Sequence, residues 1–303
     1  MVEGRDVMDA VDRPARLAVG VVGAGRVGSA LGAALVRAGH RVVAASGVSD
    51  ASRERAVERL GLVPTRPQDV VAGADLVLLT VPDDVLPGLV SGLVETGADL
   101  RGKLVAHTSG AYGLAVLNPA IKAGALPLAL HPVMTFTGRD DDLRRLTGIS
   151  YGVTAPDQLR PVAEALVIEM EGEPVWIADE DRPLYHAALA QAANHMVTLI
   201  AESSELLEKI GVEQPGRMLG PLLGAALENV LRLGIAGLTG PVVRGDAGTV
   251  RRHVDALILA APEAADAYVA LARLTADRAL AAGLLKPEAA ERLLDALGGN
   301  IWT

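Results

Sequence analysis

Short runs of apolar residues alternate with longer amphipathic stretches through residues 16–178. An uninterrupted apolar run such as 75–81 is typical of a central parallel strand, because such a strand is buried on both faces. Strands are predicted at 17–22, 40–46, 75–81, 103–108, 126–131, 149–154 and 175–178, with helices at 26–38 and 51–60 after the first two. Strands separated by helices favour the α/β class, with a doubly wound parallel sheet.

The pattern changes after residue 178, where no further β-rich run occurs and Ala, Leu and Glu dominate. Helical periodicity there predicts helices at about 182–211, 215–237, 247–260, 262–283 and 286–297. We therefore expect three parts. These are a flexible N-terminal tail over 1–15, an α/β domain over 16–178 and an all-helical C-terminal domain over 179–303.

Charge and composition exclude several classes of protein. The chain has 28 basic and 37 acidic residues, a net charge of −9 and no basic cluster, so a nucleic-acid or anionic membrane surface is not expected. Cysteine is absent, which excludes disulfides and thiolate chemistry. No apolar stretch approaches the ~20 residues that span a bilayer, and residues 1–16 lack the apolar core of a secretory signal. We expect a cytoplasmic protein without a metal site, since no histidine spacing suits zinc.

A glycine-rich loop follows the first predicted strand and opens the first helix. Gly23, Gly25 and Gly28 fit the pattern G-x-G-x-x-G, with Arg26 and Val27 between the last two. The first glycine permits a tight turn, the second lets the backbone approach a pyrophosphate, and the third allows close packing of helix and strand. This context predicts a Rossmann-type dinucleotide site; an ordinary glycine-rich turn is the alternative.

The end of the second predicted strand indicates which dinucleotide binds. An NAD site usually has an acidic residue there for the ribose 2′-hydroxyl, but no acid lies between Val43 and Asp50. Ser46, Ser49 and Arg53 could instead bind a 2′-phosphate. NADP is therefore favoured, although serines at these positions are also common turn and helix-cap residues.

Ligands of open α/β sheets bind beyond the carboxyl ends of the strands. Val81, Pro82 and Thr108 lie at such ends, and we expect them to border the cofactor. His131 ends another strand and could donate a proton near neutral pH, or simply hydrogen-bond a neighbouring loop. Ser109 could orient a substrate, or only form a turn.

The first helix of the second half carries a polar stripe. At a spacing of four residues the stripe contains His186, Ala190, Asn194, Thr198 and Glu202, among Ala and Leu neighbours. We interpret it as one wall of a cleft. Asn194 could alternatively form an interhelical hydrogen bond, and His186 could be a cap or packing residue.

A loop at 239–246 interrupts the helical half with Gly, Pro, Arg244 and Asp246. It could clamp a substrate carboxylate, since arginine pairs well with carboxylates. The alternative is a helix connection with a surface ion pair.

Several motifs in this order resemble one family. They are Gly-Ala-Gly-Arg-Val-Gly at 23–28, His-Thr-Ser-Gly at 107–110, Leu-His-Pro-Val-Met-Thr-Phe at 130–136, Tyr185-His186 with Asn194, and Gly-Pro-Val-Val-Arg-Gly-Asp at 240–246. From about residue 16 to 299 the chain resembles bacterial Rossmann-like oxidoreductases whose helical C-terminal domain is of unknown function. The resemblance implies NADP(H) binding and a homodimer built largely through the helical domain. Some of these relatives act as an alternative type of ketopantoate reductase, in pantothenate synthesis.

Hydroxyacid-type members of the wider superfamily, which includes 6-phosphogluconate dehydrogenase-like enzymes, carry Lys-x-x-x-Asn on the first interdomain helix. Asn194 matches the asparagine, but position 190 is alanine. We therefore expect an NADPH-dependent reductase of a small oxo acid, with ketopantoate as first choice. Asn194 would hold the carbonyl oxygen, His131 or His186 would supply the proton, and Arg244 would pair with the carboxylate. The alternatives are a non-catalytic NADP-binding sensor or assembly protein, a reductase of another carbonyl or imine, and, least favoured, a methyltransferase.

Overall fold

The computed structural model describes residues 16–298, so the tail expected at 1–15 lies outside the described residues. Contacts divide the chain into two units that meet between Ala190 and Gln191. The predicted boundary at 178/179 falls between the last strand and the first long helix, whose opening turns belong to the first unit. Each unit is described below by itself.

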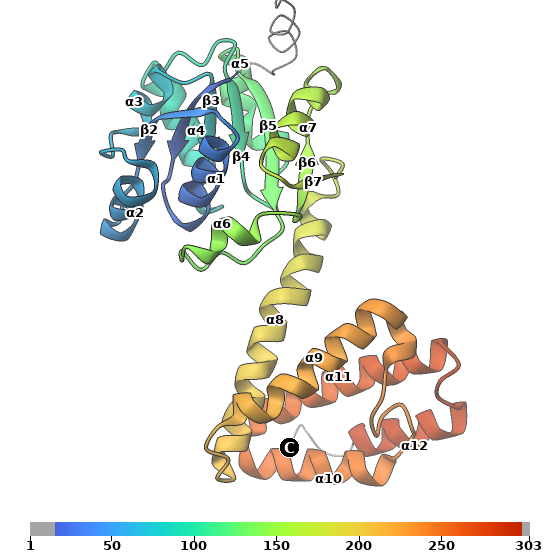
Figure 1. The fold of residues 1–303 in the computed structure, drawn as a ribbon. Helices are drawn as coiled ribbons and strands as arrows, with labels where there is room; N and C mark the ends of the chain where they lie inside the picture. The colour runs from blue at the N-terminus through green and yellow to red at the C-terminus, as the bar shows by residue number, and fades with distance from the viewer. Residues whose placement is uncertain (1–15, 299–303) are drawn as a thin grey trace, which may run out of the picture. The chain divides into compact units, whose positions relative to one another are not determined.

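Seven strands form one sheet in the described part of the first unit, in the order β2-β1-β3-β4-β5-β6-β7 (Figure 1). They are β1 (Ala18–Val22), β2 (Arg41–Ser46), β3 (Leu76–Leu79), β4 (Leu104–His107), β5 (Leu126–Pro132), β6 (Ser150–Thr154) and β7 (Glu173–Trp176). Every predicted strand is present, with ends that differ by a few residues.

The sheet is not parallel throughout, because β5 and β6 pair antiparallel. The predicted doubly wound sheet is confirmed, and among the described strands this pair is its one departure from parallel pairing. A parallel return requires a crossover that usually contains a helix packed on the sheet. Between β5 and β6 the chain has only the five-residue α6 (Asp141–Arg145), and it turns back along the same edge.

Helices cover both faces of the sheet. One apolar layer involves α1 (Arg26–Arg37), α2 (Asp50–Leu60) and α7 (Arg160–Glu169), and the other involves α3 (Pro67–Ala72), α4 (Leu86–Glu95), η1 (Leu114–Leu117) and α5 (Asn118–Lys122). The short η2 (Asp157–Leu159) precedes α7. Leu76 and Leu78 of β3 point into the first layer, whereas Val77 and Leu79 point into the second. This two-sided burial explains the continuous apolar runs of the sequence.

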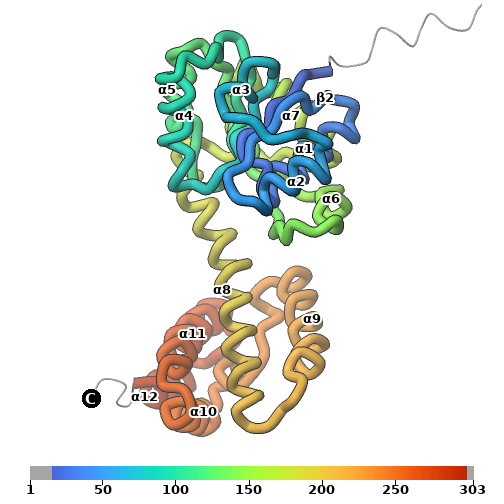
Figure 2. The backbone as a smooth tube through the Cα atoms, turned by 90° about the vertical axis from the view of Figure 1, so that its left-hand side faces the viewer, coloured from blue at the N-terminus to red at the C-terminus, as the bar shows by residue number. Residues whose placement is uncertain are grey.

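The second unit is helical in its described part. The chain enters it along α8 (Arg182–Lys209) and continues through α9 (Pro215–Leu233), η3 (Gly234–Gly237), α10 (Ala247–Ala260), α11 (Pro262–Ala281) and α12 (Pro287–Gly298). Val250, Val269 and Leu293 belong to a core shared by α10, α11 and α12. The course of these helices can be followed in Figure 2. The five predicted helices are present. Helix α9 ends earlier than predicted, at Leu233, because Gly234 takes a positive φ of 58°.

Candidate functional site

The glycine loop between β1 and α1 is fastened to the neighbouring strands. Gly23 has a φ of 99°, a conformation that only glycine adopts without strain. Its N–H and that of Ala24 donate to the carbonyl oxygen of Ser46 at the end of β2, over 3.2 and 2.7 Å. The loop therefore sits at the carboxyl edge of the sheet, as the motif predicts.

Gly28 brings α1 close to this loop. A Cβ at position 28 would lie 2.3 Å from the Gly23 carbonyl oxygen and 2.3 Å from Thr80 Oγ1. The Thr80 hydroxyl donates to the same Gly23 oxygen over 2.7 Å. Sequence reasoning missed Thr80; the available signal was a hydroxyl inside the apolar run 75–81.

The start of α1 is open to an anion. Gly25 is its N-cap and supplies no side-chain acceptor, and the first turn has no acidic residue. The first N–H groups of a helix have no partner within the helix, and the helix dipole favours negative charge beside them. Arg26 and Val27 begin this turn, so their backbone can cradle a phosphate group.

Two of the predicted phosphate ligands serve the local fold. Ser46 Oγ accepts a hydrogen bond from the Gly23 N–H at 3.2 Å, and the Ser46 side chain is buried. Ser49 is the N-cap of α2, and its Oγ accepts from the Ser52 N–H at 3.2 Å. The turn and cap interpretation therefore describes what both hydroxyls do here.

The surroundings of Arg53 leave room for a phosphate. Its side chain is 57% exposed, its Nε donates to the Gly47 carbonyl oxygen over 3.3 Å, and its nearest carboxylate is Asp50 at 3.6 Å. Asp50 is 93% exposed and lies beyond the end of β2. No acidic side chain therefore occupies the strand end where an NAD site has one.

The remaining predicted cofactor residues lie at the carboxyl ends of β3 and β4. A Cβ on Gly23 would meet Val81 Cγ1 at 3.0 Å, which places Val81 against the glycine loop. Pro82 is exposed, and Thr108 is half-buried with its N–H donating to the Leu79 carbonyl oxygen over 3.2 Å.

A cluster of aromatic rings lies at the end of β5. Nδ1 of His131 is hydrogen-bonded to the Tyr185 hydroxyl at 2.8 Å. The ring of His131 lies edge-on to those of Tyr185 and His186, with centroids 5.6 and 5.8 Å apart. A Cβ on Gly110 would lie 2.5 Å from the His186 ring and 3.0 Å from His131 Nε2. The structure thus brings together two of the predicted residues, His131 and His186, and adds Tyr185.

Burial and positive neighbours keep His131 and the nearby His107 neutral. Burial, followed by the charges of His186, Arg182 and His107, lowers the pKa of His131 to about 4. Burial also lowers the pKa of His107 to about 4, against a hydrogen bond from its ring to the Gly113 carbonyl. At neutral pH His131 is therefore not an imidazolium, which leaves His186 as the candidate among the two predicted proton donors.

Arg182 is the buried cation beneath this cluster, and sequence reasoning missed it. Its Nε donates to Thr154 Oγ1 at 2.9 Å and its Nη1 to the Ser109 carbonyl at 3.1 Å. Its Nη2 donates to the carbonyls of Gly152 and Ala129, at 2.9 and 3.2 Å. The guanidinium thereby ties β5 and β6 to the loop after β4. An arginine at the start of a helix gave no signal in the sequence.

Ser109 acts as a turn residue. Its Oγ accepts hydrogen bonds from the N–H groups of Ala111 and Tyr112, at 3.2 and 3.1 Å, and its side chain is buried. These contacts match the turn interpretation. A role toward substrate stays a prediction.

Asn194 and Arg244 lie in the second unit, and both are exposed there. Asp246 is the N-cap of α10, where its carboxylate accepts from the Thr249 N–H at 3.0 Å; that bond lowers its pKa. The described residues show no ion pair between Arg244 and Asp246. The loop is therefore a capped helix connection, and the roles of Asn194 and Arg244 toward a substrate stay predictions.

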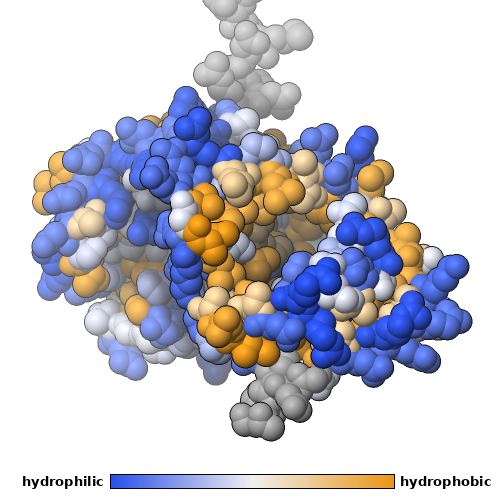
Figure 3. Space-filling model, turned by 90° about the horizontal axis from the view of Figure 1, so that it is seen from below, coloured by the Kyte–Doolittle hydropathy of each residue, from blue (hydrophilic) through white to orange (hydrophobic). Residues whose placement is uncertain are grey.

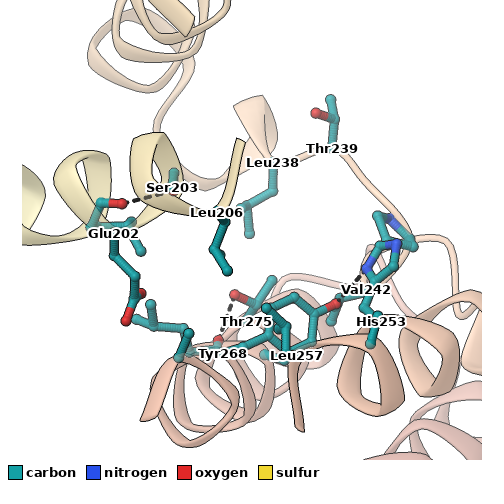
Figure 4. Close-up of a pocket in the computed structure, with 16 residues that line it drawn as sticks. Glu202, Ser203, Leu206, Leu238, Thr239, Val242, His253, Leu257, Tyr268 and Thr275 are labelled. Atoms are coloured by element: carbon teal, nitrogen blue, oxygen red, sulfur yellow. Dashed lines mark hydrogen bonds between the residues drawn. The ribbon is translucent and has the colours of Figure 1, made fainter. Parts of the chain in front are cut away.

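The second unit also has an open cavity of about 610 Å³ (Figure 4). Its walls come from α8, the 238–242 segment, α10 and α11, and they are mainly apolar. His253 Nδ1 and the Tyr268 hydroxyl form a hydrogen bond of 2.9 Å on one wall, and Glu202 lies on another.

Two family models match the sequence: a Rossmann-like domain over residues 3–132 and a domain of unknown function, DUF2520, over residues 149–275. The chain joins a Rossmann-like domain to a DUF2520 domain. The DUF2520 match begins beside β6, so it includes the last two strands of the sheet as well as α8 to α10. Comparison with curated proteins finds no match.

Solved structures share the fold over most of this chain. BF3122 from Bacteroides fragilis, a candidate NADP oxidoreductase, is 21% identical with a TM-score of 0.71, over 86% of this chain and 98% of its own. An imine reductase from Pseudomonas sp. is 20% identical with a TM-score of 0.63, over 93% and 100%. The pyrroline carboxylate reductase of Plasmodium falciparum, solved with NADP bound, is 13% identical with a TM-score of 0.56, over 87% and 98%. At these identities the likeness shows the fold.

Proposed function

We propose that the chain is an NADPH-dependent reductase of a small oxo acid, with ketopantoate as the first substrate to test. The observation that carries the proposal is the open N-terminus of α1 behind Gly25, next to a β2 end without an acidic side chain. The first feature suits a pyrophosphate, and the second suits a cofactor with a 2′-phosphate. The three similar structures support an NADP-dependent reductase, since each is named as a reductase or an NADP oxidoreductase.

The residues of the loop fit such a cofactor. Side chains are absent at Gly23 and Gly25, so the backbone there can approach phosphate oxygens, and Gly28 lets α1 pack close to the loop. Arg53 is exposed at the β2 end and is our choice for the 2′-phosphate. When bound, the reduced cofactor supplies a hydride to the substrate carbon. His186 would give the proton to the substrate oxygen, and we assign Asn194 to that oxygen and Arg244 to the carboxylate.

The test is loss of NADPH absorbance on addition of ketopantoate, with NADH and an unrelated oxo acid as controls. Saturable turnover with NADPH and ketopantoate is the expected result. If the protein turns over only a cyclic imine, its substrate is a C=N compound, as the names of two of the similar proteins suggest. Absence of NADPH binding, measured by quenching of protein fluorescence, would refute the proposal as a whole.

A non-catalytic NADP sensor is the second candidate. It is favoured by one observation, the alanine at position 190 where hydroxyacid-type relatives carry lysine. Tight NADPH binding without turnover of any carbonyl or imine would support it.

We also propose that the chain forms a homodimer through its second unit. Helix α9 is apolar, yet Pro215 is its one buried residue. By length and composition alone, the described segment 215–237 is apolar enough to cross a membrane, which is weak evidence for a membrane span. The sequence predicts a helix here but no membrane span, because Arg217, Glu228 and Arg232 interrupt the apolar run although the mean hydropathy is high.

Self-association would bury the apolar surface that α9 and the cavity leave in contact with water. Apolar side chains lie open on the face shown in Figure 3. Leu222 is 65% exposed and Leu231 79% exposed. In sedimentation velocity we expect a dimer for the wild type and a monomer for the double variant Leu222→Glu/Leu231→Glu. Val63→Glu, a control at an 80% exposed site in the first unit, should stay dimeric. A monomeric wild type would refute this assembly.

A further inference from the structure

The ring cluster at the end of β5 determines which nitrogen of His131 carries a hydrogen. His131 Nδ1 and the Tyr185 hydroxyl are 2.8 Å apart, so one of the two groups donates a hydrogen bond to the other. His131 Nε2 has no hydrogen-bond partner among the described residues, and the side chain is partly exposed. The nitrogen that could meet a ligand is therefore Nε2, and its protonation depends on what Nδ1 does.

The Tyr185 phenol is the group that donates the hydrogen bond to His131 Nδ1. Burial raises the pKa of its phenol above the ordinary value of 10, although the charge of Arg182 and a hydrogen bond from the Gly152 backbone lower it. The phenol is thus protonated at neutral pH. Among the described residues the side-chain hydrogen-bond partner of the phenol oxygen is His131 Nδ1, so the phenol proton can point at that nitrogen.

The charged groups around His131 disfavour its imidazolium form. Arg182 and His186 face it from α8, and His107 faces it from β4; each is a positive or potentially positive neighbour. The described residues place no carboxylate in hydrogen-bond contact with the ring. A neutral ring that accepts at Nδ1 carries its hydrogen on Nε2.

We propose that His131 works as a neutral imidazole whose Nε2–H donates a hydrogen bond to the carbonyl oxygen of the substrate, and that Tyr185 is the positioning residue that fixes this tautomer. The inference rests on the proposed reductase function. A neutral imidazole can polarise a carbonyl in this way without changing its own protonation. As hydride reaches the carbonyl carbon, the C=O electron pair moves to oxygen, and His186 supplies the proton that completes the alcohol. Gly110 packs closely against the two rings, since a Cβ there would lie 2.5 Å from the His186 ring and 3.0 Å from His131 Nε2.

The first experiment needs no substrate. In protein labelled with ¹⁵N-histidine, two-bond ¹H–¹⁵N correlations distinguish the Nε2–H tautomer, the Nδ1–H tautomer and the imidazolium. We expect the neutral Nε2–H form of His131 from about pH 5.5 to 8. Tyr185→Phe should shift the signals toward a mixture of tautomers. Tyr151→Phe is the matched control, because the buried Tyr151 hydroxyl has no partner among the described residues and should leave the spectrum of His131 unchanged. A Nδ1–H tautomer, or protonation near pH 6.5, in the wild type would overturn the proposal.

The second experiment uses turnover. His131→Ala should lower kcat about 100-fold, as loss of one donor to a developing oxyanion does. His131→Gln keeps a neutral N–H at a similar distance from the backbone, and it should retain more of kcat than His131→Ala. Equal losses in both variants, with both folded, would indicate a proton-donating imidazolium and overturn the proposal. Tyr185→Phe should lower kcat about tenfold with little change in KM, and Tyr151→Phe should leave both constants unchanged.

The two experiments separate this inference from the function on which it rests. If the wild type oxidises NADPH with an oxo acid but Tyr185→Phe keeps the full kcat, the inference fails and the reductase stands. If the tautomer is as expected but no carbonyl compound is reduced, the reductase fails, and the substrate role of His131 fails with it.

Discussion

Replacing Gly28 by alanine tests how tightly the glycine loop is packed. The added Cβ would lie 2.3 Å from both the Gly23 carbonyl oxygen and Thr80 Oγ1, and 3.0 Å from Val21 Cγ1. Two of these distances are far below van der Waals contact, and one is to backbone, so α1 must move away from β1 and β3. Forcing an extra methyl group into a packed interior costs about 1–3 kcal/mol. The higher helix propensity of alanine offsets at most about 1 kcal/mol of this loss of stability.

We therefore expect Gly28→Ala to lower the free energy of unfolding by about 1–2 kcal/mol. Because the moved helix carries the phosphate-binding N–H groups, NADPH affinity should also fall, by about tenfold for each 1.4 kcal/mol of binding energy lost. The stability assay is urea unfolding followed by circular dichroism, and the binding assay is fluorescence titration with NADPH.

Gly92 provides the matched control, since it lies within α4 and nothing is within 4 Å of a Cβ placed there. Gly92→Ala should raise the free energy of unfolding by up to about 1 kcal/mol and leave NADPH binding unchanged. If Gly28→Ala is as stable as Gly92→Ala and binds NADPH as the wild type does, the close-packing argument is wrong.

Three further predictions concern other parts of the chain. Tyr151→Phe removes a buried hydroxyl without a partner among the described residues, so it should raise the free energy of unfolding by up to about 1 kcal/mol in urea; a loss would reveal a bound water or other partner. Burial raises the pKa of Asp142, but hydrogen bonds from Thr137 and Gly138 outweigh it and hold that pKa below the ordinary value. The carboxylate then stabilises the fold above its unfolded pKa, and this contribution is lost as pH falls through the folded pKa. Asp142→Asn should therefore cost about 1–3 kcal/mol at pH 7 and reduce the loss of stability on acidification, and a variant with the wild-type pH profile would contradict this. Asn194→Ala should keep NADPH affinity and lose turnover; equal kcat in the variant would end the role assigned to Asn194.

Local pattern was enough to predict most elements of this fold. The continuous apolar runs arise because strands such as β3 are buried on both faces, and helical periodicity correctly located α8 to α12. The glycine loop was readable as well, because the backbone conformation at Gly23 and the close approach at Gly28 admit almost no other residue.

Tertiary structure decided what no local pattern encodes. The direction of β6 depends on how the chain turns after β5, and the partners of Arg182 come from segments far apart in the sequence. The neutral state of His131 is likewise a tertiary property, because it arises from burial and from charges on α8 and β4. The sequence predicted that a histidine, His131, lies at the end of a strand. Only its surroundings determine whether that histidine holds a proton at neutral pH, because the cost of a buried charge depends on neighbours that the fold brings together.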